Sequence, residues 1–145
     1  MPLPSFNSFE AHCVKFSVSG SSFTILNVYR PPSSSVADFF PEFSTLLEDL
    51  VSSPSELLLT GDFSFHVDTP AQFHASSFLS LLENFNLVQH VNFPTHNIGH
   101  TLHLLISRAS SNFISSVDQT LVGISDYSAV LCSLCSGPFQ NSTHI

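Results

Sequence analysis

The chain has 145 residues, the size of a single domain with one hydrophobic core. Charged residues make up 10% of it, compared with about 25% in ordinary soluble domains. Three cationic residues against eleven acidic ones give a formal net charge of −8. This charge balance excludes a basic patch. It argues against strong electrostatic binding of the protein to nucleic acid or to an anionic membrane. The low charge predicts a surface that associates readily, or a piece of something larger.

The termini and the cysteines indicate an intracellular protein. Residues 1–8 have neither the cationic start nor the apolar run of a signal peptide, and no stretch approaches the roughly 20 apolar residues of a membrane span. Cys13, Cys132 and Cys135 are odd in number, and the single C-x-x-C has no second pair to complete a zinc site. We therefore expect buried thiols in strands and a reducing location, either nucleus or cytoplasm.

The first third of the chain predicts a hairpin followed by a helix. Residues 13–18 and 23–29 read as strands, and the serine- and glycine-rich segment between them reads as a turn. The apolar residues of 36–52 then follow helical i, i+3, i+4 spacing. Pro41 lies inside this pattern, and because proline is tolerated at the first helical position, a helix that begins near Pro41 is an alternative.

The remaining elements predict an α/β sandwich. Residues 57–60 are wholly apolar, as in a buried central strand, and Thr69-Pro70-Ala71-Gln72 has the pattern of a helix start for residues 70–85. Further strands are expected at 87–91, 101–107, 113–117 and 129–134. Strands dominate the later part, which favours mixed sheets over a regular parallel β-α alternation.

Two aspartates stand where chemistry could occur. Asp62 follows a buried strand and a glycine, and Asp126 lies in a second turn before a strand. Carboxylates at strand ends can hold a metal, but they also form turns, and the residues leave both roles open. The eight histidines include no i, i+4 helical pair, so they do not predict a zinc site. Residue chemistry alone therefore predicts no function more specific than a metal-assisted hydrolase.

Four segments together resemble one family. They are Val28-Tyr29-Arg30-Pro31-Pro32, then Leu57-Leu58-Leu59-Thr60-Gly61-Asp62-Phe63-Ser64, then Phe93-Pro94-Thr95-His96 with Thr101-Leu102-His103-Leu104, and Ser125-Asp126-Tyr127. Their order and spacing resemble the endonuclease/exonuclease/phosphatase superfamily, in particular the apurinic-type endonuclease domain of non-LTR (LINE-like) retrotransposons. The resemblance spans about residues 9–131.

The resemblance implies a fold, a reaction and a cofactor. The family fold is a four-layered αββα sandwich of two mixed β-sheets, and its members cleave phosphodiesters of DNA with Mg²⁺ or Mn²⁺. Residues 1–145 are then expected to be a single partial domain, because the family's first strands carry an asparagine and a metal-binding glutamate that nothing before Phe9 supplies. An incomplete sandwich would expose a sheet edge, so self-association is expected.

The resemblance also assigns roles to individual positions. Asp62 matches the aspartate at the attacking water, and Asp126 matches an aspartate beside the metal. Ser64 replaces an asparagine that supports the phosphate, His103 replaces the aspartate that orients the catalytic histidine, and Tyr127 replaces that histidine. In the third segment, the resemblance places substrate-binding residues at Thr95 and His96. All of these side chains are expected to converge at one end of the sandwich.

Each of the three substitutions removes the chemistry of its position. Serine lacks the donor and acceptor pair of an amide. Histidine is not the acceptor carboxylate that holds an imidazole tautomer, and tyrosine, with a pKa of about 10, does not exchange protons at neutral pH as imidazole does. Two functions remain in view: a divalent-metal-dependent endonuclease, and a catalytically inactive remnant that is inert or acts as a binding or interaction module. The substitutions and the net charge, which weakens the implied DNA partner, favour the second.

Overall fold

The computed structural model describes residues 3–69, 72–95, 99–121, 128–136 and 141–144. The strands are β1 (Glu10–Val18), β2 (Ser21–Tyr29), β3 (Glu56–Asp62), β4 (Leu87–Gln89), β5 (His103–Arg108), β6 (Ile114–Leu121), β7 (Ser128–Ser136) and β8 (Asn141–His144), and the helices are α1 (Val36–Val51) and α2 (Phe73–Asn84). No helix within these ranges has the length and hydropathy needed to span a bilayer.

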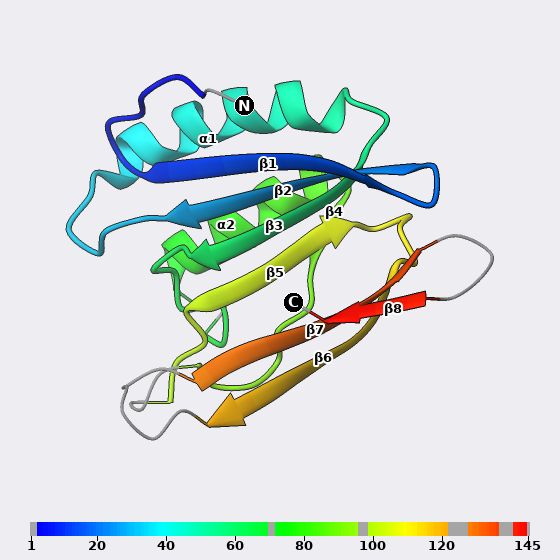
Figure 1. Cartoon of the computed structure of the whole chain (residues 1–145). Helices are drawn as coiled ribbons and strands as arrows, with labels where there is room; N and C mark the ends of the chain where they lie inside the picture. Colours follow the sequence, from blue (N-terminus) through cyan, green and yellow to red (C-terminus); the bar gives the residue numbers. More distant parts are fainter. Residues whose placement is uncertain (1–2, 70–71, 96–98, 122–127, 137–140, 145) are drawn as a thin grey trace.

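The larger sheet is mixed and has five strands in the order β1-β2-β3-β5-β4 (Figure 1). The predicted hairpin forms its first two strands, with Ser19 and Gly20 at positive φ in the turn. β2 and β3 are parallel and are connected through α1, whereas β5 runs antiparallel to both β3 and β4. The carboxyl ends of β2 and β3 therefore lie beside the amino end of β5 at one end of the sheet.

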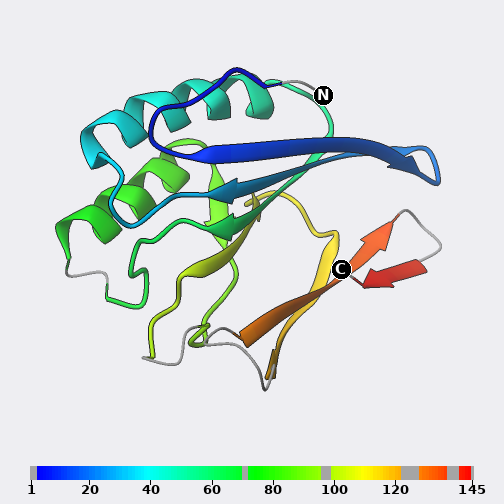
Figure 2. The ribbon, with the colours of Figure 1, turned by 60° about the vertical axis from the view of Figure 1, so that its left-hand side comes forward.

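Both helices cover one face of this sheet, and phenylalanine fills the space between them (Figures 1 and 2). The rings of Phe39 and Phe43 from α1 and Phe78 from α2 pack on Phe63 and Phe65, which follow β3. All five side chains are buried. Aromatic pairs in such offset and edge-on arrangements add to area burial, so this cluster fixes the loop after β3 against the helices.

The smaller sheet covers the opposite face (Figure 2). Its strands have the order β6-β7-β8 and are antiparallel throughout, and β8 is a strand that the sequence did not predict. Phe23, Leu58, Leu105, Phe113 and Leu134 form the core between the two sheets. The expected α/β sandwich is confirmed, with helices, mixed sheet and antiparallel sheet as its described layers.

The smaller sheet leaves part of the inner face of the larger sheet uncovered. Val14 on β1 is 58% exposed and Tyr29 on β2 is 46% exposed, although both side chains lie on the face that the core between the sheets occupies elsewhere. Cys13, on the helix side of β1, is a buried free thiol, as expected. Cys132 and Cys135 lie on β7, and their side chains are outside the described part.

One helix start agrees with its prediction and the other differs. α1 begins at Val36, as the spacing over 36–52 predicted, and not near Pro41, because the Ser35 hydroxyl accepts a hydrogen bond from Asp38 N and caps the helix there. α2 begins at Phe73, so Thr69 is not its cap. Thr69 instead belongs to the preceding turns, where its carbonyl accepts from Gln72 N and its N–H donates to the carbonyl of His66.

Substitution of Gly61 is expected to disrupt the centre of the larger sheet. Gly61 has φ +134°, and an added Cβ would lie 1.8 Å from the carbonyl oxygen of Val28 on the adjacent strand. We predict that Gly61→Ala lowers the free energy of unfolding by more than about 3 kcal/mol or prevents folding, as measured by urea denaturation. The matched variant is Gly20→Ala, at φ +82° with no atom within 4 Å of the added Cβ, which should cost only about 1–2 kcal/mol. Equal losses in the two variants would contradict the steric argument.

Candidate functional site

Asp62 and His103 face each other at the end of the larger sheet. Asp62 is the last residue of β3 and His103 is the first residue of β5, and the two are partners in the antiparallel register. The Nε2 atom of His103 lies 3.8 Å from the Oδ2 atom of Asp62, and the two side chains are 30% and 14% exposed. The structure therefore brings these two predicted site residues together, with the carboxylate well shielded and the imidazole partly open to solvent.

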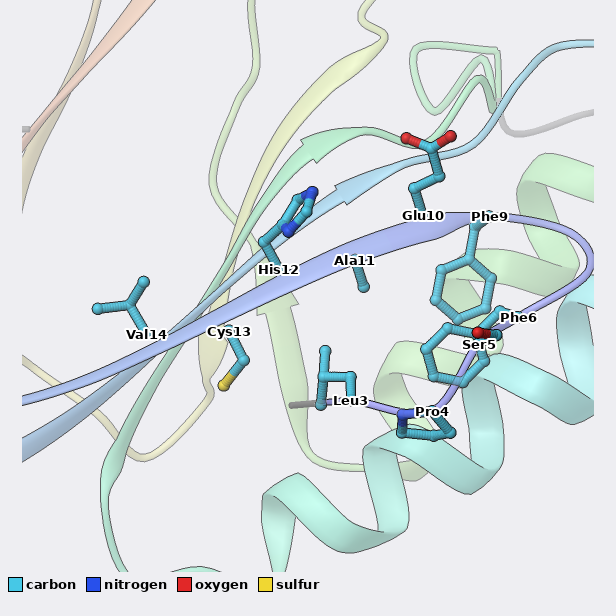
Figure 3. A pocket seen from close by; sticks show the side chains of 10 residues that line it. All are labelled: Leu3, Pro4, Ser5, Phe6, Phe9, Glu10, Ala11, His12, Cys13 and Val14. Atoms are coloured by element: carbon cyan, nitrogen blue, oxygen red, sulfur yellow. The ribbon is translucent and has the colours of Figure 1, made fainter. Parts of the chain in front are cut away.

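The register extends this pair into a row across the sheet. Glu10 is opposite Tyr29 on β1 and β2, and Tyr29 is opposite Asp62 on β2 and β3. Figure 3 shows Glu10 pointing to the other side of β1 from Phe9. Because neighbouring strands are about 4.8 Å apart, Glu10 and Asp62 are separated by roughly 10 Å across the sheet. Sequence reasoning did not place Glu10 in this row, although the register of the predicted hairpin contained the signal.

Ser64 closes a tight turn on Asp62. Its backbone N–H donates to the Oδ1 atom of Asp62 at 2.9 Å, and its hydroxyl lies 3.2 Å from the same oxygen and 2.8 Å from the carbonyl oxygen of Arg30. Its φ of 53° is in the left-handed region, which asparagine tolerates better than serine. The local bonds hold this conformation, and they direct the Ser64 hydroxyl to protein acceptors.

The side chain of Arg30 stabilises the same turn. Its Nη1 donates to the carbonyl oxygens of Phe63 at 3.2 Å and Ser64 at 3.4 Å, and its guanidinium carbon lies 4.2 Å from the ring centroid of Phe65. Burial lowers the pKa of Arg30, and the nearby carboxylate of Asp62 partly opposes that shift. Arginine stays charged under such perturbations because it is the most basic side chain in proteins. A buried positive charge thus lies next to the candidate site.

Thr95 positions the start of β5. Its side chain is fully buried, and its hydroxyl oxygen accepts from the N–H groups of Leu102 and His103 at 2.9 and 3.0 Å. Both bonds fix the backbone that carries the His103 imidazole. This gives Thr95 a positioning role, and its predicted contact with substrate stays a prediction. His96, Asp126 and Tyr127 lie outside the described residues.

A second polar cluster, which sequence reasoning missed, lies beside this row. The Oδ1 atom of Asp68 accepts from Thr101 N at 2.9 Å, and its Oδ2 lies 3.2 Å from the Nδ1 of His100. The His66 ring stacks on His100 with centroids 3.9 Å apart. Partial burial raises the pKa of Asp68, but the bonds from Thr101 and His100 outweigh it, so the net pKa is lowered.

The described residues alone do not form a metal site. No group of three His, Cys, Asp or Glu side chains in the described ranges could hold an ion. One oxygen of Asp62 accepts from Ser64 and the other faces His103, while Glu10 lies two strands away from Asp62 in the register. Mg²⁺ also gives up its waters reluctantly, so one isolated carboxylate holds it poorly. At 3.8 Å the imidazole and the carboxylate are within ion-pair reach but beyond hydrogen-bond distance, so their described contact is electrostatic.

Comparison with known proteins supports the fold. No family model and no curated protein sequence matches this chain. Among solved structures, the chain is similar to the endonuclease domain of TRAS1, a telomere-specific non-LTR retrotransposon, with a TM-score of 0.72 and 12% sequence identity. The match covers 86% of this chain and 61% of that one, so the chain spans about three fifths of the solved domain. The chain thus has the nuclease-like α/β fold that the four sequence segments implied.

The Asp68 cluster should make stability depend on pH. A lowered folded-state pKa means that Asp68 stabilises the fold above its unfolded pKa of about 4, and that this contribution is lost as pH falls through the lower folded value. We predict that Asp68→Asn is less stable than wild type at pH 7 and that the difference shrinks toward pH values of about 3, measured by urea midpoints. Asp118→Asn, at an exposed position on β6, removes the same charge and should show no such convergence. A constant deficit at both pH values would contradict the assignment to the carboxylate charge.

Proposed function

We propose that this chain is a nuclease-like domain that does not cleave phosphodiesters, a catalytically inactive relative of divalent-metal-dependent DNA endonuclease domains. The observation that carries the proposal is the contact of Asp62 with His103 and Ser64. In the family, this aspartate serves an attacking water. Here one carboxylate oxygen lies 3.8 Å from a protein imidazole, and the other accepts from protein donors.

The substituted positions support the same conclusion. The family requires a carboxylate opposite Asp62 to orient a catalytic histidine, and position 103 holds an imidazole instead. Ser64 directs its hydroxyl to Asp62 and to the Arg30 carbonyl, so it does not offer a phosphate the donor that asparagine would. Without a correctly held base and a phosphate-supporting amide, the attacking water has neither activation nor a stabilised transition state.

Two of the three cationic side chains, Arg30 and Arg108, bind groups of the protein itself. Arg30 is buried beneath the site, and Arg108 donates to the backbone carbonyls of Val51, Ser53 and Ser55 at the end of α1. Of the three cationic residues, only Lys15 is exposed. Binding along DNA depends on Lys and Arg that neutralise phosphates, so this surface supplies little of that attraction.

Nicking assays test the absence of catalysis. We predict that supercoiled plasmid incubated with wild type and Mg²⁺ or Mn²⁺ stays at the buffer background, and that Asp62→Ala gives the same result. The triple variant Ser64→Asn/His103→Asp/Tyr127→His should also stay at background, because the described residues offer no set of three metal-ligating side chains and members of a catalytic unit are not additive. Nicking by wild type that Asp62→Ala abolishes would overturn the proposal.

The alternative is a non-catalytic interaction module, and the free edge of the larger sheet favours it. β1 is an edge strand, and a cavity of about 610 Å³ runs along it between the strand and residues 3–6 (Figure 3). Its lining includes Phe6, Phe9 and the exposed Val14. An unpaired edge beside apolar side chains is a template for pairing with another strand, and a second copy of this chain offers the same edge.

Self-association should therefore depend on β1. We predict that wild type forms dimers or larger species and that Val14→Lys, which places a charge on the edge strand, shifts it toward monomer, measured by light scattering after size-exclusion chromatography. Val88→Lys is the matched control, because Val88 is also exposed but lies on the three-residue edge strand β4. A monomeric wild type, or equal effects of the two variants, would contradict pairing through β1.

A further inference from the structure

A second cavity, of about 220 Å³, lies on the helix-covered side of the larger sheet, next to the turn in which Ser64 contacts Asp62. It is bounded by the end of β2, the loop after β3 and the start of α2. Its polar lining comes from Arg30, Ser64, His66, Gln72 and His74, and none of the lining residues that the structure describes is acidic. In a chain with a net charge of −8, a cavity lined only by neutral and basic groups requires an explanation.

The first basic element is the guanidinium of Arg30. Arg30 is 3% exposed, and its Nε has no hydrogen-bond partner among the described residues. Its other described contacts are carbonyl oxygens and aromatic rings, and the nearby carboxylate of Asp62 compensates its charge only in part. A buried charge that is only partly compensated is costly, and its field acts strongly at short range in a low-dielectric interior. This field favours an anion in the adjacent cavity.

The second element is the amino terminus of α2. The first helical hydrogen bond runs from Ser76 N to the carbonyl of Gln72, so the N–H groups of Phe73, His74 and Ala75 precede the intrahelical ladder. Gln72 is the N-cap but makes no side-chain capping bond, and the first turn contains no acidic residue. α1 provides a contrast within the same chain, because Ser35 caps it and Asp38 lies in its first turn. The positive end of the α2 dipole is thus left without compensation from α2's own side chains.

The third element is His66. Its Nδ1 is buried and has no hydrogen-bond partner in the described structure, while its ring stacks on His100. A buried ring nitrogen without a partner costs free energy, and a ligand in the cavity would remove that cost. Arg30, the α2 terminus and His66 come from three separate segments of the chain, and all three border the same space.

From this convergence we propose that the cavity binds a small tetrahedral oxyanion of the phosphate or sulfate class. Helix amino termini bind such anions through backbone N–H groups and the dipole, and a guanidinium adds complementary charge. The cavity is bounded by helix and loop residues on the helix side of the sheet, and it shares Arg30 and Ser64 with the candidate site. The inference needs no cleavage of phosphodiesters and so does not rest on the proposed function. A free anion suits this acidic protein better than a nucleic-acid backbone.

Thermal denaturation and ³¹P NMR titration with inorganic phosphate test the proposal, with sodium chloride at matched ionic strength as the reference. We expect saturable broadening of the phosphate resonance and a rise in Tm of about 4 °C or more at saturation, and sulfate should compete. Gln72→Glu places a carboxylate at the N-cap and should weaken phosphate binding at least about tenfold. Asn112→Asp adds the same charge at an exposed position in the loop between β5 and β6, at the other end of the sheet, and should leave binding unchanged.

Two further variants examine the remaining contributors. His66→Phe keeps a ring for stacking but removes Nδ1, and it should weaken binding several-fold, whereas Arg30→Met should abolish it. Circular dichroism establishes whether Arg30→Met folds, and if it does not, Gln72→Glu and His66→Phe decide the outcome. Absence of saturable binding to wild type would overturn the proposal. Phosphate binding that neither Gln72→Glu nor His66→Phe weakens would also overturn it. So would binding of a 5′-phosphorylated oligonucleotide without binding of free phosphate.

Discussion

The buried guanidinium of Arg30 is the interaction on which the site end of this molecule depends. It joins the end of β2 to the loop after β3 through two carbonyls, and it is enclosed by rings from α1 and from that loop. The Arg30 N–H also donates to the carbonyl of Asp62, which continues the parallel pairing one residue beyond β2. Because the flat cation matches both ring faces and carbonyl acceptors, a lysine at this position would satisfy fewer of these contacts.

The described hydrogen bonds of Ser64 and Thr95, at this end of the larger sheet, are mostly to backbone groups. Ser64 holds a left-handed turn, and Thr95 holds the first residues of β5 through two N–H groups. Both are positions where the family resemblance implies contact with a substrate phosphate. A side chain that saturates local backbone groups can be retained for stability after its chemical partners have changed, since unpaired buried polar groups are costly. The geometry of a nuclease-like strand end can thus persist without the reaction.

Sequence patterns predicted the strands and the helices of the larger layer because their apolar periodicity is strong, as in β1, β2 and α1. They failed where long-range contacts decide the outcome. Thr69 looked like a helix cap, but turns stabilised by Asp68 and its contacts to Thr101 and His100 moved the start of α2 to Phe73. The four family segments correctly predicted the fold and the proximity of Asp62 and His103. The stacked His66–His100 pair could not be predicted, because it depends on loop packing. The position of Glu10 in the row follows from the register of the predicted hairpin, and sequence reasoning did not use that register.

The Asp62–His103 pair shows how stability and chemistry oppose each other at this position. Strand register places residues 62 and 103 directly opposite each other. The family pattern has an aspartate at both positions, and in this register the two carboxylates would face each other across adjacent strands. Like charges in that geometry are destabilising unless a metal ion or a histidine compensates them. An imidazole at position 103 removes the repulsion when neutral and attracts Asp62 when protonated. Histidine at position 103 therefore favours this strand pairing, whereas a carboxylate at the same position would require a compensating group between the strands.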